Sequence, residues 1–166
     1  MADAGPAGAS GAGAEVPTMR SSGVTVPVLK LSPGAAPPSY AHSDDGAADL
    51  RSAEKVELPP GGGRARIRTG IAIALPDGYA ALLLPRSGLA AKHGVTCLNA
   101  PALIDAGYRG ELEVLLVNTD PTSPYVVEEG DRIAQLMVHK VDHAAFAPCR
   151  SLPPGSRSGG FGHTGR

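Results

Sequence analysis

Short runs of alternating hydrophobic and polar residues, separated by turn signals, fill the middle of the chain. In residues 64–75 (RARIRTGIAIAL) and 111–118 (ELEVLLVN), large aliphatic side chains recur at every second position, so each run presents one apolar face. Further short apolar runs lie at 24–31, 81–84, 125–127 and 133–141. Many short strands at regular spacing, with turns between them, predict an all-β sandwich or barrel.

Two local signals refine this pattern. Pro27 has no N–H to donate to a ladder, so the run 24–31 is predicted to be an edge strand. Residues 87–94 (SGLAAKHG) begin with a serine that can cap a helix, continue with helix-forming residues and end on glycine. They predict one short helix of one or two turns in an otherwise β protein.

Composition divides the 166 residues into three parts. The chain has 22 Gly and 16 Pro, and they are concentrated enough at the two ends to suggest disorder there. Residues 1–23 hold too few large apolar side chains to offset the chain entropy lost on folding, which predicts a disordered tail. Residues 24–150 are predicted to form one β domain. Residues 151–166 are Gly-rich and predict a flexible C-terminal arm.

Charge and cysteine content exclude several classes of protein. The formal net charge is −1, so no basic excess indicates nucleic-acid binding. No apolar run approaches the ~20 residues that a membrane span needs, and no signal peptide is evident. Cys97 and Cys149 lack the neighbours of a metal or redox motif, which favours buried filler in a reducing compartment. We therefore predict a cytoplasmic protein without a membrane or nucleic-acid partner.

Three segments carry candidate chemistry, and each also has a plainer interpretation. Residues 84–91 (LPRSGLAA) place an arginine, a free hydroxyl and helix N–H groups together, as an anion site does, or form a routine capped turn. Residues 98–110 (LNAPALIDAGYRG) can hold a water and a sugar ring, or form a tight turn with a core tyrosine. Residues 155–165 (GSRSGGFGHTG) can wrap phosphates and stack on a base, or form a flexible terminus.

Taken together, these three segments closely resemble motifs II, III and V of the trimeric dUTPase family, in its actinobacterial form. Residues 130–136 (GDRIAQL) are similar to its motif IV, and residues 45–50 (DGAADL) to its motif I. The five motifs occur in the family's order over residues 24–166. The resemblance implies a jelly-roll-like distorted β-barrel with one short helix, assembled as a homotrimer. Motifs I, II and IV of one subunit, III of a second and V of a third would form each active site.

The resemblance also implies the reaction. It is the Mg²⁺-dependent hydrolysis of dUTP to dUMP and pyrophosphate by in-line attack of water on the α-phosphorus, which supplies dUMP for thymidylate synthesis and keeps uracil out of DNA. Asp105 would be the general base, and Asp49 would hold Mg²⁺ through water.

The remaining substrate-binding residues would follow from the same motifs. Arg86, Ser87, Gly88 and Gln135 would contact the α- and β-phosphates, and Arg157, Ser158 and Thr164 the γ-phosphate. Asn99, Leu103, Ile104 and Glu113 belong to the hairpin that would select uracil, largely through its backbone groups. Tyr108 would pack under the sugar, and Phe161 with Gly162 would close over the base.

The sequence departs from the family pattern at two positions, and parts of it also fit other functions. Ala47 stands where the family has glycine, which costs of order 1 kcal/mol or more if that position needs a positive φ. Arg157 lies four residues before Phe161 rather than five. Asp131 and Arg132 are expected to pair in a turn or a trimer channel rather than touch substrate.

Three alternative functions fit parts of the sequence. The first is a dCTP deaminase, which would need a glutamate near Leu115. The others are a non-catalytic dUTP-binding module and a structural jelly-roll protein without a ligand.

Overall fold

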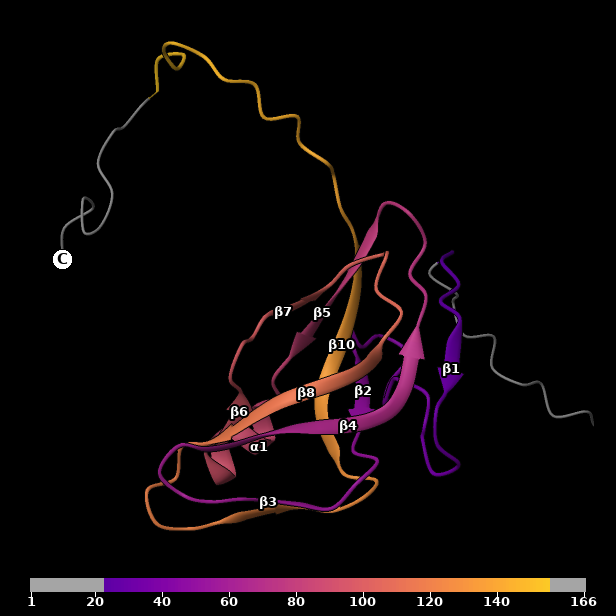
Figure 1. Ribbon diagram of the computed structural model, residues 1–166, viewed down its shortest axis with the longest axis vertical. Helices are drawn as coiled ribbons and strands as arrows, with labels where there is room; N and C mark the ends of the chain where they lie inside the picture. The colour runs from indigo at the N-terminus through magenta and orange to yellow at the C-terminus, as the bar shows by residue number, and fades with distance from the viewer. Residues whose placement is uncertain (1–22, 156–166) are drawn as a thin grey trace, which may run out of the picture.

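The structure is a computed structural model that describes residues 23–155. Its strands form two four-stranded sheets and one two-stranded ribbon (Figure 1). The first sheet has the order β1 (Val28–Lys30), β4 (Gly63–Ile73), β8 (Glu111–Asn118) and β6 (Val95–Cys97). The second has the order β2 (Ala48–Arg51), β10 (Arg132–Lys140), β5 (Tyr79–Leu84) and β7 (Ala102–Ile104), and the ribbon pairs β3 (Val56–Leu58) with β9 (Tyr125–Val127).

A single cluster of buried aliphatic side chains joins the three sheets. Ile67 and Leu116 of the first sheet, Leu50 of the second and Leu58 of the ribbon all belong to it, and each is at most 1% exposed. All strand pairs are antiparallel, and the only helix of the described residues is α1 (Ser87–His93). The predicted all-β class, with a jelly-roll-like fold and one short helix, is therefore confirmed.

The two longest strands follow the sequence pattern. In β8 the aliphatic residues at alternate positions, Leu112, Val114 and Leu116, are buried, as predicted. Strand β4 lies beside β8 and begins with the same alternation, but a bulge after Arg68 shifts its register, and its last residues are buried on both faces. Strand β1 lies at the sheet edge, which confirms the inference from Pro27, although the strand covers only three residues.

Helix α1 forms where the sequence predicted it, but it begins differently. Gly94 ends the helix in the left-handed conformation, with φ +64°, and its N–H bonds to the carbonyl groups of Ala90 and Leu89. The N-cap residue is Arg86, and no side chain caps the helix. The expectation that Ser87 is the cap was therefore wrong. As the first helical residue, Ser87 keeps its hydroxyl free of a capping bond.

The ends of the chain and the cysteines complete the description. Cys97 is buried, as predicted, and burial raises the pKa of its thiol to about 11. Cys149 is exposed, so the buried-filler interpretation was wrong for it, because residues 142–155 leave the body of the protein after β10 as an extended segment (Figure 1). In the described residues, no helix has the length and apolar character of a membrane span. The predicted boundaries of the tail, the domain and the arm stay predictions.

Candidate functional site

The sheet pairing places three of the sequence motifs together. Asp49 of β2 lies opposite Gln135 of β10, and Gln135 lies opposite Leu84, the last residue of β5. The chain then continues through Arg86 into α1. The motif-I carboxylate, the motif-IV amide and the motif-II segment therefore meet at one end of the second sheet.

Two arginines hold the Asp49 carboxylate. Arg86 Nε donates to Oδ1 at 3.2 Å, and Arg132 Nη1 donates to Oδ2 at 3.1 Å. Arg86 Nη1 also donates to the carbonyl oxygen of Arg132 at 3.1 Å, so the two arginines are hydrogen-bonded to each other as well as to Asp49. Asp49 is only 6% exposed, whereas both guanidinium groups reach solvent. One carboxylate facing two guanidinium groups leaves a net positive charge at the surface, which suits an anionic ligand.

Arg132 contacts the Asp49 carboxylate, and the sequence interpretation missed this contact. Arg132 was expected to pair within a turn or a trimer channel, but it reaches across from β10 to Asp49 of β2. The signal was the strand pairing of Gln135 with Asp49, which brings the start of β10 near Arg86, and it is not visible in sequence spacing. Asp131 does lie in a turn, where its Oδ2 accepts the Glu128 N–H at 2.9 Å, as expected.

The donor set around Asp49 fits a hydrated Mg²⁺ rather than a protein-caged one. In residues 23–155, no group of three or more His, Cys, Asp or Glu side chains could hold a metal ion. A carboxylate can accept about four hydrogen bonds, so Asp49 keeps free lone pairs beside its two arginine contacts. Mg²⁺ typically keeps several waters and uses one or two carboxylates together with substrate phosphates. A hydrated Mg²⁺ that also contacts substrate phosphates would need only one such carboxylate.

Ser87 and Gly88 lie at the exposed start of α1 and directly follow Arg86. They are therefore next to the Asp49 cluster, which consists of Asp49, Arg86 and Arg132. The first N–H groups of a helix have no partner within it, and here no side chain caps them. A Cβ added at Gly88 would meet nothing within 4 Å, so the backbone there is open to an approaching ligand. Together with Arg86, these groups form a surface of hydrogen-bond donors.

Asp105, the predicted general base, lies at the other end of the same sheet. It follows β7, whose Ile104 pairs with Ala81 of β5, so Asp105 stands level with Ala80. The Asp49 cluster is level with Leu84, four residues further along β5. At about 3.3 Å per residue this is about 13 Å along the strand. Within one chain, the structure does not bring Asp105 to Asp49.

The loop that carries Asp105 is exposed and held by local hydrogen bonds. Tyr108 N–H donates to the Asp105 carbonyl oxygen at 3.0 Å, and its hydroxyl donates to the Glu111 carbonyl oxygen at 2.9 Å. The Tyr108 hydroxyl lies 2.5 Å from where a Cβ on Gly110 would stand, so the ring covers that glycine. Tyr108 is 43% exposed, so the alternative in which it belongs to the core was wrong. The ring presents a surface to a ligand.

Other residues of the predicted uracil hairpin are also accessible. Asn99 is exposed, Leu103 is 58% exposed and Ile104 is half-buried. The Glu113 carboxylate pairs with Arg66 Nη1 at 3.3 Å. Strand β7 and the loop after it therefore offer backbone groups and apolar surface, while the Glu113 side chain has a partner of its own.

The departure at Ala47 carries no strain. In the described part of the chain, positive φ angles occur only at glycines, so Ala47 has an ordinary backbone conformation. The cost foreseen for a positive φ therefore does not arise. The predicted motif-V residues Arg157, Ser158, Phe161, Gly162 and Thr164 lie outside the described residues.

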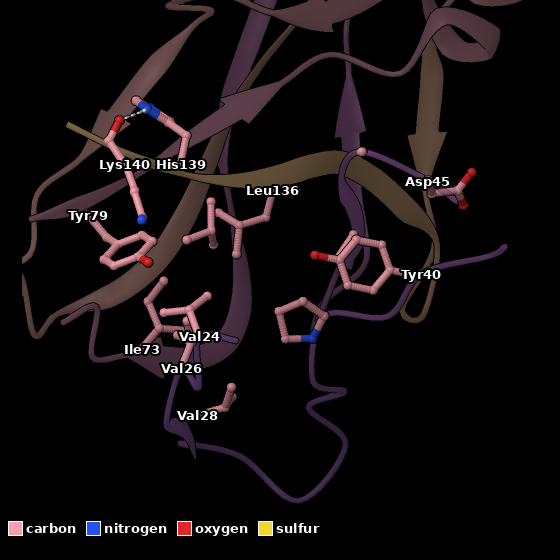
Figure 2. Close-up of a pocket in the computed structure, with 14 residues that line it drawn as sticks. Val24, Val26, Val28, Tyr40, Asp45, Ile73, Tyr79, Leu136, His139 and Lys140 are labelled. Atoms are coloured by element: carbon pink, nitrogen blue, oxygen red, sulfur yellow. Dashed lines mark hydrogen bonds between the residues drawn. The ribbon is translucent and has the colours of Figure 1, made fainter. Parts of the chain in front are cut away.

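A separate cavity, lined by both apolar and polar side chains, does not belong to this site. It measures about 570 Å³, and Val24, Val26, Ile73 and Leu136 gather in it, with Tyr79 among them (Figure 2). None of the predicted site residues lines this cavity. Leu136 lies next to Gln135 in β10, and neighbouring strand residues point to opposite faces. The cavity is therefore on the other face of the sheet from Asp49.

The chain is similar to dUTPases of known sequence. The model of the dUTPase family matches residues 35–165. The deoxyuridine 5'-triphosphate nucleotidohydrolase of Thermobifida fusca is 56% identical over 143 residues, covering 86% of this chain and 79% of that protein. The enzyme of the same name from Mycobacterium tuberculosis is 53% identical over 118 residues, covering 71% and 76%. The relatives include actinobacterial enzymes, in agreement with the sequence resemblance.

Solved structures agree with the fold. A mutant dUTPase of Staphylococcus bacteriophage 80alpha with dUpNHpp has a TM-score of 0.77 and 28% identity, covering 86% of this chain and 99% of that one. A mutant dUTPase of the S. aureus phage phi11, described with a coordinated structural Mg(II) ion, has a TM-score of 0.71 and 28% identity, covering 79% and 100%.

Proposed function

This chain belongs to the dUTPase family, and from that membership we propose that it hydrolyses dUTP to dUMP and pyrophosphate by in-line attack of water on the α-phosphorus. The observation that carries the proposal is the buried Asp49 carboxylate between Arg86 and Arg132, beside the open start of α1. This arrangement suits a triphosphate. In a cell the reaction would supply dUMP for thymidylate synthesis and keep uracil out of DNA.

The chain is proposed to act as a homotrimer with shared sites. The support is the position of Asp105, about 13 Å along the sheet from the Asp49 cluster within one chain. A second copy that presents its Asp105 loop to the Asp49 cluster of the first would complete the site. Closed assemblies with cyclic symmetry repeat such a contact at every interface.

In the completed site, the phosphates would lie at the start of α1. The guanidinium of Arg86, the Ser87 hydroxyl and the Gly88 N–H would donate to the α- and β-phosphate oxygens, and the Gln135 amide would assist them. Arg132 would keep Asp49 in place from the other side. Donors that are fixed before the substrate arrives stabilise the charge of the transition state without reorganisation.

The proposed metal is Mg²⁺, held through water by Asp49. When bound with the triphosphate, Mg²⁺ neutralises phosphate charge and favours departure of pyrophosphate. Asp49 would orient the metal-bound water, while Arg86 and Arg132 keep the carboxylate in one position. The two ion pairs on Asp49 support this division of roles.

The neighbouring chain would supply the base and the uracil pocket. Asp105 would accept a proton from the attacking water, a contribution of about 10²–10⁴ in rate. Asn99, together with the backbone around Leu103 and Ile104, would pair with uracil, and Tyr108 would pack under the deoxyribose. A cytosine would leave some of these groups unpaired, which can cost about 10⁴-fold in specificity.

The last parts of the proposal concern residues outside the described range and the compartment. Arg157, Ser158 and Thr164 are proposed to close over the γ-phosphate, with Phe161 and Gly162 over the base. We also infer a reducing compartment, the cytoplasm, supported by two cysteines that are free in the structure. No role for a nucleic acid or a membrane is proposed.

Pyrophosphate release from dUTP, measured beside dCTP, dTTP and UTP, tests the proposed function. We expect release from dUTP alone, and a fall of about 10²–10⁴ in kcat for Asp105→Asn. Ammonia release from dCTP would instead indicate the deaminase alternative, which Leu115 makes unfavourable because that reaction needs a glutamate in this region. Tight binding of dUTP without turnover would indicate the non-catalytic module. Near-normal turnover of Asp105→Asn would refute the assignment of the base.

A further inference from the structure

Helix α1 carries the proposed phosphate-binding residues, yet little of its own surface holds it in place. None of its seven residues is buried, and only Leu89 packs against the core. A helix of this length is only marginally stable by itself, so its position depends on contacts made elsewhere. The contacts that fix α1 therefore also fix Ser87 and Gly88.

Besides the Arg86–Asp49 ion pair at its start, α1 is held at its opposite end, at Gly94. The Gly94 carbonyl oxygen accepts the backbone N–H of Thr119 at 2.9 Å and the Thr119 hydroxyl at 2.7 Å. The fit is close, because a Cβ added at Gly94 would lie 3.0 Å from both Thr119 Oγ1 and the Asp120 nitrogen. The end of the helix is thus clamped by the chain that follows β8.

The clamping segment is itself rigid. Asn118 is fully buried, and its side-chain amide donates to the carbonyl oxygens of Leu58 and Ser123 at 3.1 and 2.9 Å. Its Oδ1 accepts the Asp120 N–H at 3.0 Å. A buried amide with all these partners satisfied resists movement, because displacing it would leave polar groups unpaired.

A second contact comes from the strand that follows this turn. The ring of Tyr125 lies 4.9 Å from the His93 ring, centroid to centroid, at an interplanar angle of 47°, which is within the range of separations at which aromatic rings contact each other. Tyr125 also packs against the core, so it links the last turn of α1 to the body of the protein. Burial, together with Asp131, raises the pKa of the Tyr125 phenol, and the nearby charge of Arg86 opposes this.

We propose that residues 118–125 position α1 for the triphosphate, with Thr119 and Tyr125 as positioning residues that hold Ser87 and Gly88 from the far end of the helix. The inference rests on the proposed function. Because a seven-residue helix spans about 10 Å, a tilt of ~10° about Gly94 would move the donors at Ser87 and Gly88 by about 2 Å. Loosening the clamp should therefore weaken the hold on the phosphates and leave the uracil pocket unchanged.

The test compares Thr119→Val with Thr122→Val. Both variants remove one hydroxyl from the same turn, but the Thr122 hydroxyl contacts Asp120 and Ser123 rather than α1. For Thr119→Val we expect a rise of about three- to tenfold in KM for dUTP, with kcat within about twofold. Thr119→Val should also bind a non-hydrolysable dUTP analogue more weakly and deoxyuridine as well as before. Amide hydrogen exchange across residues 90–94 should be faster in this variant. Thr122→Val should match the unmodified protein in each.

Conservative variants keep the test informative if a protein loses stability. Thr119→Ser retains the hydroxyl and should restore KM, and Tyr125→Phe retains the ring and should behave normally where Tyr125→Leu does not. If Thr119→Val and Tyr125→Leu match Thr122→Val in KM and amide exchange, the proposal is overturned. A separate control identifies failure of the proposed function itself. That failure would appear as no pyrophosphate release by the unmodified protein, or as no effect of Ser87→Ala on analogue binding.

Discussion

Two impaired variants of this chain should restore part of each other's activity when they assemble together. Asp105→Asn removes the proposed base and should lower kcat by about 10²–10⁴. Asp49→Asn disturbs the group that orients the hydrated metal, a kind of change that typically costs about 10–100-fold. Each variant keeps the half of the site that the other has lost. Because those halves lie about 13 Å apart in one chain, they can meet only across an interface.

The magnitude of the recovery follows from counting. In trimers assembled at random from equal amounts of both variants, a given site has an intact Asp49 in roughly one half of cases. The next chain supplies an intact Asp105 in roughly one half of cases, independently. About one quarter of the sites should therefore be complete. If one chain supplied both groups, no site would be complete, since every chain carries one of the two substitutions.

The assay is pyrophosphate release by co-expressed variants, with native mass spectrometry to confirm that mixed trimers form. We expect about a quarter of the activity of the unmodified protein. As a reference, the unmodified chain mixed equally with Asp105→Asn should give about half. Activity no greater than the sum of the separate variants, in a sample that contains mixed trimers, would refute the shared site.

Four further predictions concern individual residues. Cys149 should react with a thiol reagent at pH 8 in the native protein, whereas Cys97 should react only after unfolding. Because burial raises the Cys97 pKa from 9.0 to about 11, the unfolding free energy should decrease as pH rises from 9 to 11, and Cys97→Val should show a smaller decrease, since the raised pKa of Tyr125 also contributes. Two backbone N–H groups hold the pKa of Asp120 below its usual 3.8. Asp120→Ala should therefore lower the melting temperature at pH 7. At a pH below that lowered pKa, the melting temperatures of the variant and the unmodified protein should be similar. Asn118→Ala should lower the unfolding free energy in urea by about 1–3 kcal/mol, because it leaves buried backbone groups unpaired.

The sequence predicted the elements that depend on local pattern. Alternation identified β4 and β8, Pro27 identified an edge strand, and Gly94 marked the end of α1. By contrast, β2, β3, β6 and β7 have only three or four residues each, and their sequences were not interpreted as strands. Such short strands are defined by the partner they pair with, which periodicity in one segment cannot reveal.

The same distinction applies to the site. Family-like strings identified Asp49, Arg86, Ser87 and Gln135, and the structure brings them to one end of a sheet. Arg132 was missed because its contact with Asp49 joins residues 83 positions apart. Ser87 was taken for the helix cap because its residue type favours that position, yet the backbone starts the helix one residue earlier.

The buried position of Asp49 in the second sheet makes it important for stability as well as for ligand binding. Its carboxylate is almost wholly removed from solvent, and two guanidinium groups are its only ionic partners among the described residues. Replacing either arginine would leave the buried carboxylate only partly neutralised, which would lower the stability of the protein even without a bound nucleotide. Selection for a working enzyme and selection for a well-folded chain thus act on the same residues, and harmful changes there should first appear as a lower yield of native protein.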